Sequence, residues 1–136
     1  MQHFLPGKSC KMEKQFMKSS NYLLECCVDS AYSARMAKKG GADRLELCSN
    51  LVIGGTTPTL ALYEQIRKQT GIRIHVLIRP RFGDFLYSED ETALICKEID
   101  AFRAAGADGV VIGSLSPDGS LCTCLLYTSP SPRDCS

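Results

Sequence analysis

The 136-residue sequence lacks two features that would assign it quickly to a class of protein. It has no excess of charge: 16 basic residues against 15 acidic ones give a net charge of +1, whereas proteins that bind nucleic acid or anionic membranes concentrate Lys and Arg. It also has no long apolar run that could act as a signal peptide or cross a membrane. With 44% apolar and 23% charged residues, we expect an ordinary soluble globular domain.

Zinc-finger spacing is absent as well, although the chain contains eight cysteines. There is no Cys-x-x-Cys pair, and Cys122-x-Cys124 has no histidine nearby, which argues against a zinc ribbon or finger. Because no signal peptide accompanies the cysteines, a disulfide framework is not expected, and we predict reduced thiols in a cytosolic protein. Four cysteines are treated as background: Cys10, Cys96, Cys122 and Cys135.

Short apolar runs with strand character alternate with helical patterns from residue 22 onward. The runs "YLLECCV", "RLELC", "RIHVLI" and "GVVIGS" predict four strands, and the segments between them predict helices over residues 30–39, over residues 59–69 and after Ser88. Repeated strand–helix units imply parallel strands joined by right-handed crossovers. The predicted fold class is therefore α/β.

Capping residues mark the predicted helix ends. We expect Asp29 to cap the first helix, which ends at Gly40-Gly41. Thr57 would cap the second helix, with Pro58 at its first position.

The third helix has the clearest signals. Ser88 and Glu91 form a capping box, and an apolar stripe follows with helical spacing at Ile95, Ile99 and Phe102. In addition, "KKGGADRLELC" and "RAAGADGVVIG" share a helix end, a Gly-Ala-Asp step and a strand, which indicates an internal repeat.

Alternation along the predicted strands separates two kinds of side chain, because successive residues point to opposite faces. The apolar set should lie under the helices: Leu24, Cys26, Val28, Leu45, Leu47, Val76 and Ile78. The mixed set should face the interior of a barrel: Glu25, Cys27, Glu46, Cys48, His75, Leu77 and Arg79. His75 lies near the start of its strand, so we expect a structural histidine there.

The motif Glu-x-Cys occurs twice, as Glu25-x-Cys27 and Glu46-x-Cys48. Both thiols, like Arg79, come last on their predicted strands, and α/β folds place ligand sites at the carboxyl ends of strands. Neighbouring strands lie about 4.8 Å apart, so Cys27 and Cys48 are expected to share one ligand, and two thiolates suit a soft ion such as Cu(I). The alternative is that each cysteine acts as a small buried hydrophobe.

A second candidate site combines carboxylates with arginines. Glu25 and Glu46 are expected one layer below the thiols, and buried carboxylates need partners, for which Arg44, Arg79 and Arg81 are candidates. Such a pocket is suited to acid–base catalysis, and the same charges also fit a purely structural network.

The loops after the second and third predicted strands suggest a pocket for a small anionic ligand. Gly54, Gly55, Thr56 and Thr57 bring flexible backbone and two hydroxyls to a helix N-terminus, and Asp84 lies with two arginines in "RPRFGDF". The alternative is an ordinary glycine turn before a capped helix.

Three segments together resemble the CutC copper-homeostasis family: "LLECCVDSAYSARMAKKGGADRLELCSNLVIGGTTPT", "IRPRFGDFLYS" and "GADGVVIGSLSPDG". The resemblance implies a TIM (β/α)8 barrel, a link to copper, oligomers, and a location in the cytosol and in animals also the nucleus. The thiols proposed as Cu(I) ligands in that family match Cys27 and Cys48. The chain departs from the usual family pattern at Cys26, Ile53 and Phe82.

The resemblance also sets the expected domain limits. A closed barrel needs about 250 residues, so we expect an incomplete barrel of about four units over residues 21–119, with its fourth strand as an exposed apolar edge. Residues 1–20 are expected to be a disordered leader. Residues 120–136, which end in "YTSPSPRDCS", are expected to be a disordered or artefactual tail outside the family pattern.

Three functions follow from these observations. The first is copper homeostasis through Cu(I) bound by Cys27 and Cys48. The second is an enzyme that acts on a small anionic metabolite through the Glu/Arg pocket, and the third is an inactive fragment.

Overall fold

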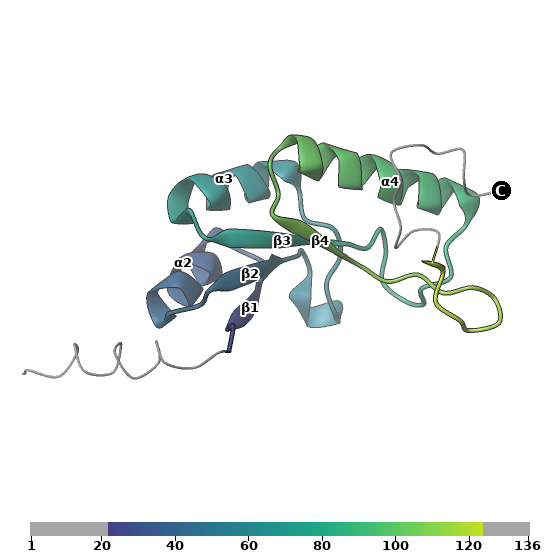
Figure 1. Ribbon diagram of the computed structural model, residues 1–136, viewed down its shortest axis with the longest axis horizontal. Helices are drawn as coiled ribbons and strands as arrows, with labels where there is room; N and C mark the ends of the chain where they lie inside the picture. Colours follow the sequence, from purple (N-terminus) through teal and green to yellow (C-terminus); the bar gives the residue numbers. More distant parts are fainter. Residues whose placement is uncertain (1–21, 124–136) are drawn as a thin grey trace, which may run out of the picture.

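The computed structural model describes residues 22–123, and in this range strands and helices alternate along the chain (Figure 1). The strands are β1 (Glu25–Val28), β2 (Arg44–Leu47), β3 (Arg73–Ile78) and β4 (Gly109–Ile112). The α-helices are α2 (Ala31–Gly40), α3 (Leu60–Thr70) and α4 (Glu89–Ala104), and a short 3-10 helix, η2 (Leu51–Ile53), follows β2.

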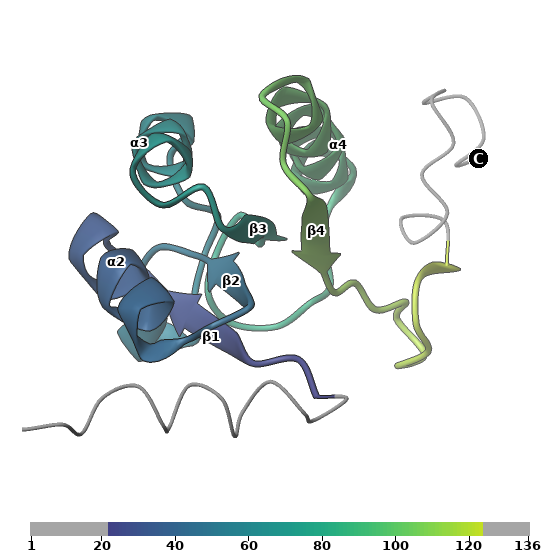
Figure 2. The same ribbon diagram turned by 60° about the vertical axis from the view of Figure 1, so that its left-hand side comes forward.

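The four strands form one parallel sheet in the order β1-β2-β3-β4. Helices α2, α3 and α4 lie on the same side of this sheet, as two views show (Figures 1 and 2). This is the arrangement of four consecutive units of a TIM barrel, so the predicted α/β class and partial barrel are confirmed. Within residues 22–123, β1 and β4 form the two edges of the sheet.

The core lies between the sheet and the helices, as the alternation of side chains predicted. Its strand residues are fully or almost fully buried, and they pack against apolar side chains of the three helices. The strand contribution consists of Val28, Leu45, Leu47, Ile74, Val76 and Ile78, and Cys26 packs against the same cluster. Leu24 is the exception: it precedes β1, lies beyond the cover of the helices and remains 42% exposed.

Two of the predicted helix caps are wrong by one or two residues. Ser30, not Asp29, caps α2, because its backbone is extended and its hydroxyl accepts a hydrogen bond from the Ser33 N–H at 3.1 Å. Thr59, not Thr57, caps α3 by accepting the Leu62 N–H.

Thr57 cannot cap a helix because its groups already bind neighbouring elements. Its hydroxyl accepts the Arg79 N–H and donates to Glu98 on α4, both at 2.9 Å, and its own N–H donates to the Arg79 carbonyl. Thr57 therefore joins the segment before α3 to the end of β3.

The signals for α4 are confirmed. The Ser88 hydroxyl accepts the Glu91 N–H while the Glu91 carboxylate accepts the Ser88 N–H, which completes the capping box. The apolar stripe, made of Ile95, Ile99 and Phe102, is buried against the sheet.

The internal repeat is structural as well. Asp43, just before β2, accepts the Leu24 N–H at 2.9 Å, and Asp108, just before β4, accepts the Ile74 N–H at 2.9 Å. Each aspartate thus fixes the start of its own strand to the preceding strand. The shared glycine of the two segments, Gly41 in one and Gly106 in the other, has φ of +98° and +83° and ends a helix.

No helix within residues 22–123 combines the length and apolar character needed to span a membrane. The predicted leader and the tail after residue 123 lie outside the described residues, as do Cys10, Cys124 and Cys135.

Candidate functional site

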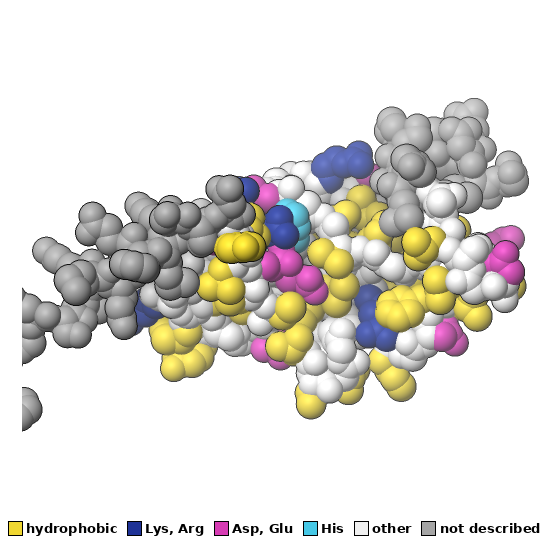
Figure 3. Space-filling model, turned by 60° about the horizontal axis from the view of Figure 1, so that its bottom comes forward, with side chains coloured by type: hydrophobic (Ala, Val, Ile, Leu, Met, Phe, Trp, Pro, Cys, Tyr) yellow, Lys and Arg dark blue, Asp and Glu magenta, His cyan; other side chains and the backbone are white. Residues whose placement is uncertain are grey.

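The face of the sheet turned away from the helices carries the mixed set of side chains. Strand pairing aligns Cys27 with Glu46, Glu46 with His75, and His75 with Gly109 in one row across all four strands. Figure 3 looks onto this side of the molecule and shows a histidine beside basic and acidic side chains, with apolar groups around them.

This register corrects the expected layering of the two Glu-x-Cys motifs. Strand pairing places Cys27 of the first motif beside Glu46 of the second motif. Glu25 therefore lies one row below Cys27 as expected, whereas Glu46 lies in the same row as Cys27. Cys48 directly follows β2, one row closer to the carboxyl ends than Cys27. The last residue of β1 is Val28, not Cys27.

Cys27 is exposed on the open face. Its thiol pKa is raised, first by partial desolvation and then by the negative charges of Glu46 and Glu25. At neutral pH the group is therefore a protonated thiol that a ligand can reach from solvent.

Cys48 lies on the same face but is only 1% exposed. Its Sγ donates to the Val28 carbonyl at 3.6 Å, and its backbone N–H donates to the same oxygen at 3.0 Å. Desolvation by burial, followed by the charge of Asp29, raises the pKa of this thiol to about 11. The expectation that both thiols are open to a ligand thus fails for Cys48 in this conformation.

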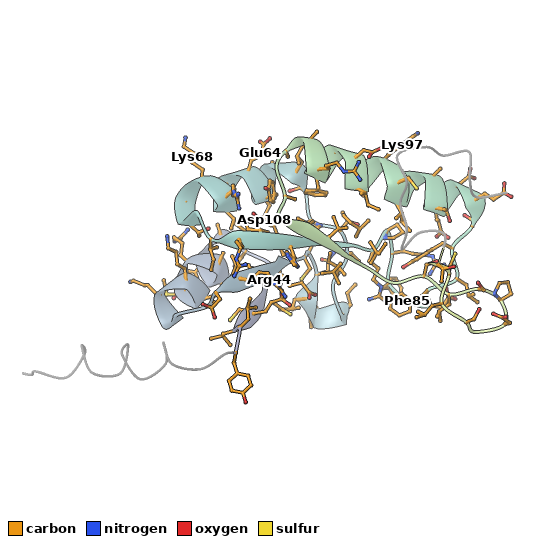
Figure 4. The ribbon with its side chains drawn as sticks, viewed as in Figure 1. Arg44, Glu64, Lys68, Phe85, Lys97 and Asp108 are labelled. Atoms are coloured by element: carbon orange, nitrogen blue, oxygen red, sulfur yellow. The ribbon has the colours of Figure 1, made fainter. Side chains whose placement is uncertain are left out.

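Glu25 and Glu46 both lie on the open face, and Arg44 is the arginine that reaches Glu25. Arg44 Nε and Glu25 Oε2 form an ion pair, and His75 Nδ1 lies 4.0 Å from the same carboxylate oxygen. Figure 4 shows Arg44 at the strands, below helices α3 and α4 in this view.

His75 belongs to the open face and is only partly buried there. A Cβ at Gly109 would lie 2.8 Å from His75 Nε2, so the glycine of β4 leaves the space that the imidazole occupies. Strand alternation predicts the correct face for His75, but its position early in the strand predicts only a structural role and does not indicate that it lies near Glu25.

Arg79 binds backbone oxygens of two loops rather than carboxylates. Its Nη1 donates to the carbonyls of Gly54 and Gly55, and its Nη2 donates to the carbonyl of Gly83 at 2.8 Å. The guanidinium also packs on the ring of Phe85 at 4.8 Å.

Arg81 is bound within its own loop and to α4. It pairs with Glu91 at 2.6 Å and with Asp84 at 3.0 Å, and it packs on the ring of Tyr87. Hydrogen bonds from Arg81 hold the pKa of Asp84 below its ordinary value, and the Ser88 N–H and Arg81 do the same for Glu91. Arg79 and Arg81 thus lie at the rim, away from the Glu25–Arg44 pair.

The predicted anion loop uses its backbone donors internally. The N–H groups of Gly54, Gly55, Thr56 and Thr57 donate to the carbonyls of Leu51, Asn50, Ser49 and Arg79, respectively. In this conformation, an anion at the loop would need donors other than these four. At the same rim, Ile53 and Phe82, two of the departures from the family pattern, are exposed.

Groups of three or more His, Cys, Asp and Glu side chains arranged for a metal ion do not occur among residues 22–123. On the open face, the soft side chains among the predicted site residues are the two thiols of Cys27 and Cys48. Cys27 belongs to β1 and Cys48 directly follows the neighbouring strand β2.

The sequence model of the CutC family matches residues 22–128 of this chain. A mouse (Mus musculus) protein named copper homeostasis protein cutC homolog is 41% identical over 121 residues, which cover 85% of this chain and 44% of that protein. The human (Homo sapiens) protein of the same name is 46% identical over 103 residues, covering 76% of this chain and 38% of that protein.

A solved structure shows the same similarity. The putative copper homeostasis protein CutC from Streptococcus agalactiae superposes with a TM-score of 0.70 at 28% identity, covering 77% of this chain and 52% of that one. The chain therefore spans less than half the length of the mouse and human relatives that it matches.

Proposed function

Because the chain belongs to the CutC family, we propose that it takes part in copper homeostasis by binding Cu(I) with the thiolates of Cys27 and Cys48. The observation that carries the proposal is that both side chains lie on one face of neighbouring parallel strands, near the carboxyl ends. Thiolates are the soft ligands that Cu(I) prefers. The proposal requires reduced thiols, which the cytosol provides.

The charges around the thiols support a cation rather than a free thiolate. Burial is the main cause of the raised thiol pKa values, and the charges of Glu25, Glu46 and Asp29 raise them further, so an uncompensated negative sulfur is disfavoured. The same carboxylates favour a bound positive ion. The site thus keeps its thiols protonated when empty. When both thiols release their protons, one bound Cu(I) offsets half of the negative charge that the two thiolates carry beside these carboxylates.

An anaerobic Cu(I) competition titration tests the proposal. We expect the wild-type chain to bind one Cu(I) more tightly than about 1 μM, and the Cys27→Ser/Cys48→Ser variant to lose this binding. Cys96→Ser is the matched control, because Cys96 lies on α4 among the core residues and should not contribute. Equal, weak binding by the wild type and the double variant would assign both thiols to packing.

The pH dependence of the same titration counts the ligands. Each thiol must release its proton to bind the metal, so the apparent affinity should rise about a hundredfold per pH unit below the thiol pKa values when two thiols take part. For Cys48→Ser the rise should fall to about tenfold per unit. A slope that Cys48→Ser leaves unchanged would exclude Cys48 as a ligand.

A second function, catalysis on a small anionic metabolite, is supported by one observation on the open face. The Glu25–Arg44 pair with His75 nearby offers a cation for an anionic group and two groups that exchange protons. Binding of anionic metabolites that Arg44→Met abolishes and the Cys27→Ser/Cys48→Ser variant retains would favour this function over copper binding. Binding that persists in Arg44→Met would exclude the pocket.

A further inference from the structure

The thiol of Cys48 is covered by a turn that fits it closely. A Cβ added to Gly55 would lie 3.4 Å from the Cys48 Sγ and 2.7 Å from Leu77 Cδ2. Gly55 is itself buried and has φ of +85°, so both the space and the backbone conformation require glycine. The turn at Gly55 therefore packs closely against the side chain of Cys48, which is 1% exposed.

The covering turn is a self-contained unit. The N–H groups of Gly54 and Gly55 donate to carbonyls of Leu51 and Asn50, inside the turn. At its base, Ser49 and Thr56 exchange two backbone hydrogen bonds of 2.9 and 2.8 Å. Because these bonds are internal, they do not tie the turn to the rest of the protein.

Arg79 holds this turn from outside. Its Nη1 donates to the carbonyls of Gly54 and Gly55 at 3.4 and 3.2 Å, and its Nη2 donates to Gly83 in the next loop. Figure 4 shows Phe85, on which the guanidinium packs, beyond the strands at the rim. The Arg79 backbone is itself bonded to Thr57 through both its N–H and its carbonyl, so the side chain extends from a fixed point.

We propose that Arg79 is a positioning residue that latches the Gly54–Gly55 turn over Cys48, so that a ligand meets Cys27 first and reaches Cys48 only when the turn lifts. The planar fork of arginine can bond two loops at once, which a lysine ammonium cannot do in the same geometry. The consequence for copper rests on the proposed function, whereas the latch itself does not.

Alkylation of the native protein by iodoacetamide, followed at each cysteine by mass spectrometry, tests the latch. In Arg79→Met we expect Cys48 to react about tenfold or more faster than in the wild type, because the bonds that hold the turn closed are lost. The rates at Cys27, which is already exposed, and at Cys96 should stay unchanged. Arg79→Lys should restore part of the protection.

Arg81→Met is the matched control. Arg81 is a neighbouring rim arginine that also packs on an aromatic ring, but it makes no hydrogen bond to the Gly54–Gly55 turn. Its replacement should leave the Cys48 rate at the wild-type value. Equal acceleration in both variants, or acceleration of Cys48 and Cys96 by the same factor, would mean general loosening and would overturn the latch.

A second variant keeps the test decisive if Arg79→Met fails to fold. Gly55→Ala pushes the turn away from Leu77 and Cys48 while Arg79 stays in place, so Cys48 should again react faster than in the wild type. A folded Gly55→Ala protein with wild-type Cys48 reactivity would show that the turn does not cover the thiol, and the proposal would fail.

Copper association separates this inference from the proposed function. If the wild type binds Cu(I), one phase of Cu(I) association should be absent in Cys48→Ser. The same phase should be faster in Arg79→Met than in the wild type. Absence of Cu(I) binding in the wild type would overturn the copper function and leave the alkylation comparison as it stands. Unchanged alkylation in Arg79→Met would overturn the latch and leave the copper function intact.

Discussion

On the helix-covered face of the sheet, Leu45, Leu47 and Ile74 are completely buried, whereas on the opposite face Glu25, Cys27 and His75 remain within reach of solvent. Both faces come from the same strands and often from adjacent residues. The apolar face therefore carries most of the stabilisation by burial, and the other face is free to hold charged and nucleophilic groups. The exception is Cys48, which belongs to the open face by alternation but is as buried as the core.

The largest difference in the free energy of unfolding is expected between substitutions of two adjacent β2 residues whose side chains point to opposite faces. Leu45→Ala should lower the free energy of unfolding by about 2–5 kcal/mol, because it leaves a cavity in the packed core. Glu46→Ala should change it by about 0.5 kcal/mol or less. Urea denaturation of the two variants measures the difference. Similar losses would mean that the open face also carries the fold.

An intermediate effect on the free energy of unfolding is expected from ionisation of the Cys48 thiol at alkaline pH. Its folded-state pKa of about 11 exceeds the ordinary value of 9.0, so the protonated thiol is favoured by folding. The contribution of Cys48 to stability should be complete below about pH 9 and should be lost as the pH rises towards 11, because the unfolded chain ionises first.

Tyr63 and Tyr87 also have raised pKa values, so the measurement must isolate Cys48. The difference in urea midpoint between the wild type and Cys48→Ala, followed from pH 8 to pH 11, does this. A difference that stays constant over this range would mean that the Cys48 thiol is not buried in solution. Cys48 would then behave like the rest of the open face.

The smallest effect should come from the ion pair on the open face. Arg44 and Glu25 are each about one-quarter exposed in their side chains, so Arg44→Met should cost about 0.5–1 kcal/mol at low salt, and added salt should reduce the cost. Glu25→Gln is the matched partner and should cost a similar amount. A loss as large as that of Leu45→Ala would show that the pair is part of the structural core.

Local patterns predicted most of the fold. The run "RIHVLI" gave the bounds of β3, and the capping box with its apolar stripe gave the start and the buried face of α4. The Gly-Ala-Asp repeat predicted two similar turns, although not the hydrogen bond that each aspartate makes to the preceding strand. The caps of α2 and α3 were wrong because Ser30 follows a competing acidic residue and because Thr57 is bound by β3 and α4.

The sequence by itself determined the α/β class, the two faces of each strand and the pair of cysteines on one face, because these depend on the spacing of residues along the chain. Only the tertiary structure decided how the strands are staggered, so that Cys27 lies beside Glu46 rather than beside Cys48. It also decided that Arg44 pairs with Glu25 while Arg79 binds the turn over Cys48. These contacts depend on the distances between side chains after the strands have paired. The spacing of residues along the sequence does not determine those distances.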